Sequence, residues 1–274
     1  MIGSPVIDVV ASDLDGTFLG ADGQVSPLNR RAVLRAAQLG VRVVFATGRP
    51  ARWLQPLDCV RSARPSVLAS NGAVVVDLET RRVVQSHPVP RDTTAAVAAD
   101  LLAALPDTGF AVEYADGGWG RTPAYPLRGD FVPENVCSAS VADLLDAGSP
   151  VKLLVYSPSL PTDGLTRRAD AVVAGRLSLT YSMVQRCGLL ELSAPGVDKA
   201  FALGCLLDEW GVSPDRVAAF GDMPNDLPML RLAGHPFAMS DAHRSLLDAG
   251  FASAGDHNQS GLGRTLLALL GEPV

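Results

Sequence analysis

The sequence predicts an α/β protein, in which a second α/β segment is inserted into a doubly wound, Rossmann-like parallel sheet. Two observations lead to this prediction. Apolar runs at 9–12 and 41–46 have the character of buried strands, and a helical pattern at 29–38 joins them through short connections, which implies a parallel pair with a right-handed crossover. After Pro88 the pattern changes, and mixed helical and strand segments follow until a core-like pattern resumes near Asp198.

Capping and turn signals mark the ends of the first elements. Ser26-Pro27 has the pattern of an N-cap followed by proline in the first helical turn, and Gly40 ends that helix. The strand after it is rich in β-branched residues. The next elements expected are a helix at 51–60, a strand at 66–70 and a small hairpin of 74–77 with 82–84.

The predicted division is a core of residues 1–86 and 192–274 with an insert of residues 87–191. Within the insert we expect helices at 91–105, 141–147 and 165–174 and strands at 110–114, 151–156, 177–183 and 189–192. After it we expect helices at 198–210, 227–232, 242–247 and 262–270 and strands at 216–220 and 236–239.

Composition and charge are those of an ordinary globular protein. Of 274 residues, 47% are hydrophobic and 19% are charged, and the formal net charge is −6. No cluster of lysine and arginine stands out, which argues against nucleic acid as a partner. No apolar run reaches the ~18 residues of a membrane span. Because the chain starts with a strand pattern and not with a basic leader, we expect a cytoplasmic protein without a membrane partner.

Cysteine spacing gives no sign of a zinc site. The cysteines are far apart, no Cys-x-x-Cys pair occurs, and no histidines cluster with them. We therefore expect free, buried thiols in a reducing cytosol. The residues concerned are Cys59, Cys137, Cys187 and Cys205.

Two acids end the first apolar run. Asp13 and Asp15 are two residues apart, so they would point the same way from an extended strand, at the carboxyl edge where open α/β sheets bind ligands. Carboxylates this close repel each other unless a cation or a shared proton intervenes. The pair therefore suggests a metal site, although an ordinary Asp-Gly turn would explain Asp15-Gly16 equally well on its own.

Other polar motifs fall at or beside predicted strand ends. Each has an ordinary explanation as a turn or as a solvated residue. Together they fit phosphoryl transfer from a monoester, which needs an anionic nucleophile, strong local cations and phosphate-binding donors. The motifs are Thr47-Gly48-Arg49, Lys199 and Gly221-Asp222-Met-Pro-Asn225-Asp226.

These motifs, in this order, resemble the signatures of the haloacid dehalogenase superfamily of phosphohydrolases. The resemblance covers nearly the whole chain, and it is similar in detail to the Cof-type branch, whose members carry a large α/β cap between the second and third signatures. Segments 71–73, 221–226 and 237–242 support this branch. The sequence departs from the common pattern at Ala200, where glycine is frequent, and at Asp198 and Asp241.

The resemblance implies a role for each motif. Asp13 would be nucleophile and Mg²⁺ ligand, with Asp222 and the backbone carbonyl of Asp15 as further metal ligands. The Asp15 side chain would be the general acid and base. The expected phosphate contacts are the Leu14 and Gly48 amides, the Thr47 hydroxyl, Lys199 and the Asn225 amide.

Three residues keep alternative roles. Arg49 is expected either to reach the substrate or to tie the cap to the core. Asn71 is expected either to touch the substrate or to serve as a turn residue. Asp226 is expected to brace its loop or the water shell of the metal, with direct ligation as the alternative.

The substrate depends on the cap. An irregular loop there either forms a lid over the leaving group or serves the surface or the cap–core contact. Its candidate residues are Trp119, Arg121, Tyr125 and Arg128, with Tyr181 and Arg186 as further candidates.

The core motifs and the family resemblance together predict a Mg²⁺-dependent phosphatase. Its substrate would be a small phosphorylated metabolite, either a sugar phosphate or a phosphorylated cofactor, hydrolysed through an aspartyl-phosphate on Asp13. The alternatives are a phosphosugar mutase or other phosphotransferase, which would need a second phosphate site in the cap, and a non-catalytic regulatory protein on the same fold. The oligomeric state is not predicted.

Overall fold

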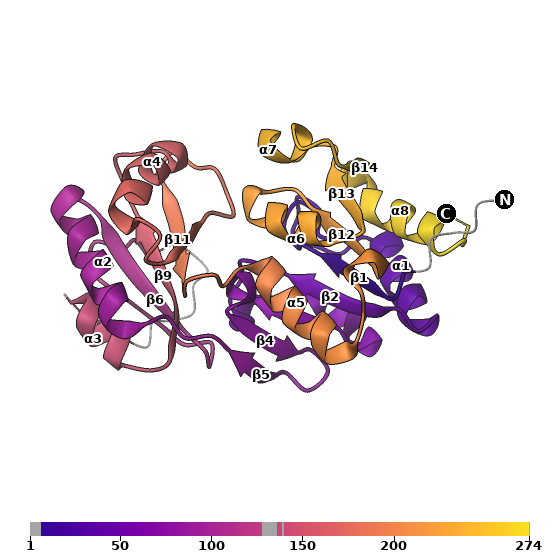
Figure 1. The fold of residues 1–274 in the computed structure, drawn as a ribbon, viewed down its shortest axis with the longest axis horizontal. Helices are drawn as coiled ribbons and strands as arrows, with labels where there is room; N and C mark the ends of the chain where they lie inside the picture. The colour runs from indigo at the N-terminus through magenta and orange to yellow at the C-terminus, as the bar shows by residue number, and fades with distance from the viewer. Residues whose placement is uncertain (1–6, 128–135, 139, 274) are drawn as a thin grey trace.

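The computed structural model describes residues 7–127, 136–138 and 140–273, and these residues form two β-sheets (Figure 1). The larger one, the core sheet, has eight strands in the order β14-β13-β12-β1-β2-β3-β4-β5. The pairs from β14 to β3 are parallel, and β4 and β5 are added antiparallel. The strands are β1 (Val9–Ser12), β2 (Arg42–Ala46), β3 (Ser66–Ala69), β4 (Val74–Asp77), β5 (Arg82–Ser86), β12 (Val217–Gly221), β13 (His235–Met239) and β14 (Ala252–Gly255).

Helices that pack in pairs cover the core sheet. α1 contacts α8, and α5 contacts α6. α1 starts as the sequence predicts, because the Ser26 side chain accepts a hydrogen bond from the Asn29 amide and Pro27 occupies the first turn. The bounds of these helices are α1 (Pro27–Gln38), α5 (Lys199–Trp210), α6 (Leu227–Leu232), α7 (Arg244–Leu247) and α8 (Gly261–Leu269).

The second sheet, the cap sheet, has six strands in the order β10-β11-β9-β6-β7-β8. Its pairs are antiparallel except for β7 with β8. The strands are β6 (Gly109–Tyr114), β7 (Trp119–Arg121), β8 (Val136–Cys137), β9 (Pro150–Tyr156), β10 (Ser178–Thr180) and β11 (Leu189–Ser193). Its helices are α2 (Arg91–Ala104), α3 (Val141–Asp146) and α4 (Thr162–Val173), which lie on the left in Figure 1.

The two faces of the cap sheet have different partners. Alternate strand residues such as Val112, Leu153 and Leu190 pack with the apolar side chains of α2, α3 and α4. Because successive strand residues point to opposite faces, their neighbours Glu113, Lys152 and Glu191 point away from these helices. This second face meets the core, as the contacts described below show.

The architecture confirms the predicted fold class, a doubly wound parallel sheet with an inserted α/β segment. Every strand of the cap sheet lies between β5 and β12 in the chain. The division into a core of 1–86 and 192–274 and a cap of 87–191 remains our proposal for the folding units, and β11 crosses its second boundary by reaching Ser193.

The segment predicted as a helix at 51–60 is helical but not α-helical. It forms two 3₁₀ helices, η1 (Ala51–Trp53) and η2 (Gln55–Ala63). Pro56 lies at the start of η2 and has no N–H, so an α-helix running through it would lose a hydrogen bond. The proline therefore accounts for the break between η1 and η2 at Leu54.

Short strands were missed or overextended by the sequence pattern. β7, β8 and β14 were not predicted, and the strand expected at 177–183 is reduced to β10. Strands of two to four residues contain too few positions to show an alternating pattern.

The expectation of buried cysteines was wrong in part. All four cysteines are free, but Cys59 and Cys137 are exposed, and Cys187 and Cys205 are partly exposed. Separately, no helix in the described parts of the chain is both long enough and apolar enough to cross a bilayer.

Candidate active site

The carboxyl ends of β1 and β12 bring two predicted acids together. The strands are parallel neighbours, and the Asp13 amide continues their ladder by donating to the Phe220 carbonyl at 3.0 Å. Asp222 follows the end of β12, and Asp226 follows one turn later. Carboxylate oxygens of Asp13, Asp222 and Asp226 lie within 4.8 Å of one another. Parallel pairing therefore explains why residues far apart in the sequence share one site.

Lys199 holds two of these acids. Its Nζ lies 2.6 Å from Asp13 Oδ1 and 2.6 Å from Asp226 Oδ1, and its side chain has no exposed surface. Asp198 caps the helix that positions it, since its carboxylate accepts from the Phe201 amide. Burial alone would lower the pKa of Lys199, but the charges and hydrogen bonds of the two aspartates outweigh it and raise that pKa.

The site carries more negative charge than Lys199 can balance. Burial, followed by the charge of Asp226, raises the pKa of Asp222 to about 7. Burial also raises the pKa of Asp13 well above its usual range. A bound cation would remove this penalty by stabilising the ionised carboxylates, so the donor set fits a metal ion that prefers oxygen ligands.

Hydrogen bonds and a glycine fix the shape of this acidic site. Thr17 Oγ1 donates to Asp222 Oδ1 at 2.9 Å, and the amides of Asp222 and Met223 donate to Asp226 Oδ2. Gly16 has φ of +82°, and a Cβ atom there would lie 2.4 Å from Asp222 Oδ2. Only glycine allows the turn after β1 to approach the Asp222 carboxylate this closely.

Asp15 stands apart from the cluster of acids. Its side chain is about half exposed and forms a two-pronged ion pair with Arg49, with Nε–Oδ2 at 2.7 Å and Nη2–Oδ1 at 2.6 Å. Arg49 also lines the cavity, and its expected role, to reach the substrate or to tie the cap to the core, stays a prediction. Metal ligation by the Asp15 carbonyl stays a prediction.

Loops after β2 and β3 place the remaining predicted residues. The Thr47 carbonyl accepts from the Asn71 amide at 2.8 Å, which joins the two loops. Asn71 adopts φ of +58° in its turn, and its side chain accepts from Asn225 Nδ2 at 3.1 Å. Leu14 is fully buried, and its carbonyl organises the turn after β1. Phosphate binding by these groups stays a prediction.

A cavity of about 400 Å³ lies between the core loops and the cap sheet. The predicted site residues in its wall are Asp13, Asp15, Thr47, Gly48, Arg49 and Asn225. Asn71 and Lys199 adjoin the wall through Asn225 and Asp13, to which they are hydrogen-bonded.

The predicted cap residues are distributed over different places. Trp119 and Tyr125 line the cavity and are almost fully buried. Arg121 donates to the Tyr125 carbonyl at 3.3 Å and so contacts the backbone of that loop. The ring of Tyr181 contacts His243 of the core edge to face. Arg186 is exposed, and Arg128 lies outside the described residues.

The chain shares its sequence pattern with a known enzyme family. The profile of the haloacid dehalogenase-like hydrolases matches residues 10–266. The chain belongs to this family. The resemblance to its Cof-type branch is thereby confirmed, as is the predicted enzyme class, a phosphoric monoester hydrolase.

Named relatives of this hydrolase include a phosphatase of similar length. The hydrolase described here is 28% identical over 265 residues to the 5-amino-6-(5-phospho-D-ribitylamino)uracil phosphatase YbjI of Escherichia coli (strain K12), and the match covers 93% of each chain. It is 26% identical to the chloroplastic endoribonuclease YBEY of Arabidopsis thaliana, matching 86% of the hydrolase but only 42% of that protein. Among solved structures, SMU.1108c of Streptococcus mutans UA159 has the same fold, with a TM-score of 0.82 at 22% identity, covering 97% and 100% of the two chains.

Three charged cap residues in the cavity wall of the hydrolase escaped the sequence analysis. Glu113, Lys152 and Glu191 come from β6, β9 and β11 and are at most 5% exposed. A usable signal was present, because each is a lone charge inside an apolar strand, and buried charges require partners. Arg52 and Ser182 line the same wall and were also missed.

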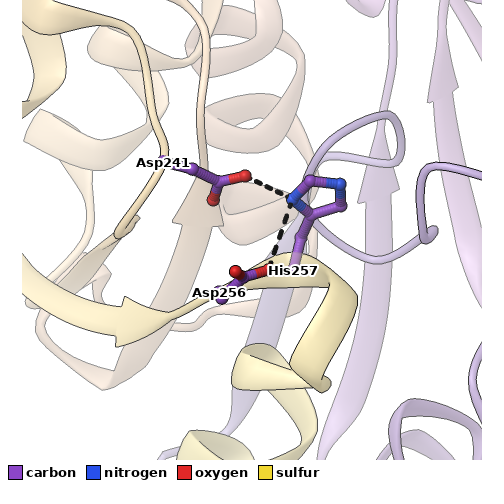
Figure 2. A group of neighbouring side chains, drawn as sticks. All are labelled: Asp241, Asp256 and His257. Carbon is purple, nitrogen blue, oxygen red and sulfur yellow. Dashed lines mark hydrogen bonds and ion pairs between the residues drawn. The ribbon is translucent and has the colours of Figure 1, made fainter.

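A second group of polar side chains lies past the ends of β13 and β14. Figure 2 shows Asp241 and Asp256 converging on Nδ1 of His257, at 2.5 Å and 4.0 Å. Asp241 is one of the three residues at which the sequence departs from the family pattern, and its partner here is His257. Both acids are partly exposed, and the Asp256 carboxylate also caps the turn at Asn258. The group fits a surface ion pair.

Proposed function

We propose that this hydrolase is a Mg²⁺-dependent phosphatase that acts through an aspartyl-phosphate on Asp13. The observation that carries the proposal is the position of Asp13, whose carboxylate lies in the cavity wall, bonded to a fully buried lysine and close to Asp222 and Asp226. A carboxylate can attack phosphorus only if nearby positive charge offsets the repulsion between two anions.

Asp13 and Asp222 would hold the metal, which supplies electrostatic stabilisation of the phosphoryl oxygens. In the first step a carboxylate oxygen of Asp13 bonds to phosphorus, the ester P–O bond breaks, and Asp15 gives a proton to the leaving oxygen. In the second step Asp15 takes a proton from water, whose oxygen bonds to phosphorus and frees Asp13. Lys199 keeps the nucleophile in place throughout.

The cavity wall favours a leaving group with an apolar or planar part. Trp53, Trp119, Tyr125, Leu154 and Leu189 line it alongside the polar groups. Such a wall offers stacking and apolar contact to a planar ring, so we expect a phosphorylated cofactor or its precursor as the substrate. The similarity to a phosphatase named for a ribitylaminouracil phosphate supports this choice.

The cationic side chains of the cavity wall favour a phosphatase over a mutase, because each of them is already paired with an acid. Arg49 is bonded to Asp15, Arg52 to Glu113 and Lys152 to Glu191. A second phosphate would have to compete with an acid for each of these cations. Hydrolysis therefore fits the site better than transfer between two phosphate positions.

A phosphate-release screen tests this proposal. We expect release from pyridoxal phosphate or flavin mononucleotide to exceed release from hexose phosphates, to stop in EDTA and to return with Mg²⁺. Trp119→Ala should lower kcat/KM for the ring-bearing substrates about 10-fold or more. Leu102→Ala, on the exposed side of α2, should leave it unchanged. Metal-independent release, or no release from any phosphomonoester, would contradict the proposal.

A further inference from the structure

Buried charges on the cap sheet face the core. Lys152 Nζ lies 2.6 Å from Glu191 Oε2 and 3.9 Å from Glu113 Oε2, and the three residues are between 1% and 5% exposed. Charged groups are costly to bury unless their hydrogen-bonding capacity is used. The partners of these side chains therefore indicate what the charges are for.

Three further hydrogen bonds of these charges reach the core loops after β2 and β3. Lys152 Nζ donates to the Gly48 carbonyl at 2.8 Å. Asn71 Nδ2 donates to Glu191 Oε2 at 2.6 Å, and Ser70 Oγ donates to Glu113 Oε2 at 3.0 Å. The cap charges thus hold the two loops in which the phosphate-binding groups are predicted.

Glu191 determines which way two amide side chains point. A carboxylate accepts hydrogen bonds and cannot donate, so Asn71 must turn its Nδ2 toward Glu191. Its Oδ1 then accepts from Asn225 Nδ2 at 3.1 Å. Asn225 lies in the cavity wall, 4% exposed, and its Oδ1 has no hydrogen-bond partner in the described structure. The orientation of Asn225 is therefore set from the cap.

The same carboxylate also holds a cap loop over Gly48. Ser182 Oγ donates to Glu191 Oε1 at 2.5 Å. A Cβ atom on Gly48 would lie 3.2 Å from the Ser182 Cβ, so the two loops are in close contact. Glu191 thus joins the cap loop, the core loop and the buried lysine.

We propose that Glu191 and Lys152 are positioning residues that seat the cap on the phosphate-binding loops and, through Asn71, orient the Asn225 amide in the cavity wall. This proposal rests on the proposed function. Both charges belong to the cap sheet, so lifting the cap breaks hydrogen bonds to neutral groups of Gly48 and Asn71 and leaves the ion pair intact. Phosphate affinity therefore depends on contact between the cap and the core loops, because the Asn225 amide is correctly oriented only while Glu191 holds Asn71.

Inhibition by inorganic phosphate tests the coupling. The inhibition constant is measured for the Mg²⁺-loaded wild type, Glu191→Ala, Asn71→Ala and the double variant. We expect each single change to raise this constant about 10-fold, the effect of one hydrogen bond to a charged ligand. Because Glu191 acts through Asn71, the double variant should be no weaker than Asn71→Ala alone. Glu191→Gln should restore part of the affinity, since its carbonyl can accept from Asn71.

Two further variants complete the experiment. Glu191→Ala leaves the buried Lys152 without its closest acidic partner, so Glu191→Ala/Lys152→Met is made as well. This double variant also lacks the Lys152–Gly48 hydrogen bond, so it should lose at least as much phosphate affinity as Glu191→Ala in a folded protein. Asp146→Asn, which alters an exposed carboxylate of the cap paired with Arg91, should change nothing.

The outcomes separate the two proposals. If the wild type hydrolyses substrate and is inhibited by phosphate, but the Glu191 variants bind phosphate as tightly, the positioning role is wrong. Independent, additive effects of Glu191→Ala and Asn71→Ala would also overturn it. If the wild type neither hydrolyses a phosphomonoester nor binds phosphate, the proposed function falls, and the positioning role falls with it.

Discussion

Two buried lysines lie near the cavity, one in the core and one in the cap, and each is held by acids. Lys199 of the core lies between Asp13 and Asp226, and Lys152 of the cap is paired with Glu191. Removing one partner of such a pair costs about 3–5 kcal/mol of folding free energy, since a buried charge is left unmatched. Each lysine is therefore fixed in place, Lys199 behind the predicted nucleophile and Lys152 above the phosphate loops.

The charge of Glu191 makes the folding stability of the protein depend on pH. Burial acts to raise the pKa of Glu191, but the charge and hydrogen bonds of Lys152 and its other partners bring it below the usual value. A carboxyl with a depressed folded pKa stabilises the protein above its unfolded pKa of about 4.3, and this contribution is lost as pH falls through the folded pKa. We expect Tm to fall on acidification below about pH 4.5.

A double variant measures how much of the fall in Tm at low pH comes from Glu191. In Glu191→Gln/Lys152→Met the group that takes up the proton is gone, so Tm should fall less between pH 5 and pH 3 than in the wild type. Thermal melts across this range provide the measurement. Equal slopes in both proteins would show that Glu191 does not have a depressed pKa.

At the scale of elements, the turn after β1 determines the geometry of the acidic site. Gly16→Ala would place a Cβ atom 2.4 Å from Asp222 Oδ2 at a φ of +82°. We expect the Asp222 carboxylate to be displaced and the Mg²⁺ concentration for half-maximal rate to rise about 10- to 100-fold. Metal titration of the initial rate measures the effect.

Gly23→Ala is the matched control for this change. Gly23 also has a positive φ, of +72°, but a Cβ atom there would meet nothing within 4 Å. Its cost should be limited to backbone strain of about 1 kcal/mol, with the same metal dependence as the wild type. A similar loss of metal affinity in both variants would mean that strain, and not contact with Asp222, is responsible.

Elements with strong local signals could be predicted from the sequence. Ser26-Pro27 marked the start of α1, and apolar runs marked the strands of the core sheet. The grouping of Asp13 with Asp222 also followed from parallel topology, because strand ends meet at one edge. Prediction failed at 51–60, where one continuous helix was expected and Pro56 instead lies at the start of a second, 3₁₀ helix.

Lone charges in apolar strands mark the cap residues in the sequence, but local patterns could not show what these charges contact. Lys152 and Gly48 are 104 residues apart, and no local periodicity encodes their contact. Glu113 and Glu191 lie in apolar strands of an antiparallel sheet. From the sequence alone, their side chains could equally point to a solvent-exposed face of that sheet. Only the packing of the cap sheet against the core shows that these charges are buried.

At the scale of the whole molecule, the cavity exists because the two sheets meet. The core supplies the acids, Lys199 at the start of α5 and the predicted phosphate-binding groups, and the cap sheet supplies Trp119 and much of the wall proposed for the leaving group. Enclosure strengthens electrostatic interactions within the site by excluding water. The reaction chemistry and the choice of substrate are thus assigned to different parts of the chain.

The central claim is that Asp13 is phosphorylated during turnover, and trapping the intermediate tests it most directly. Asp15→Asn removes the group assigned to activate water, so an aryl phosphate, whose leaving group needs no proton, should phosphorylate this variant faster than the adduct hydrolyses. Mass spectrometry after rapid acid quenching should find one phosphoryl group per chain, on the peptide that contains Asp13, and none in Asp13→Asn/Asp15→Asn. Phosphate on another residue, or steady turnover by the doubly substituted protein, would contradict the account.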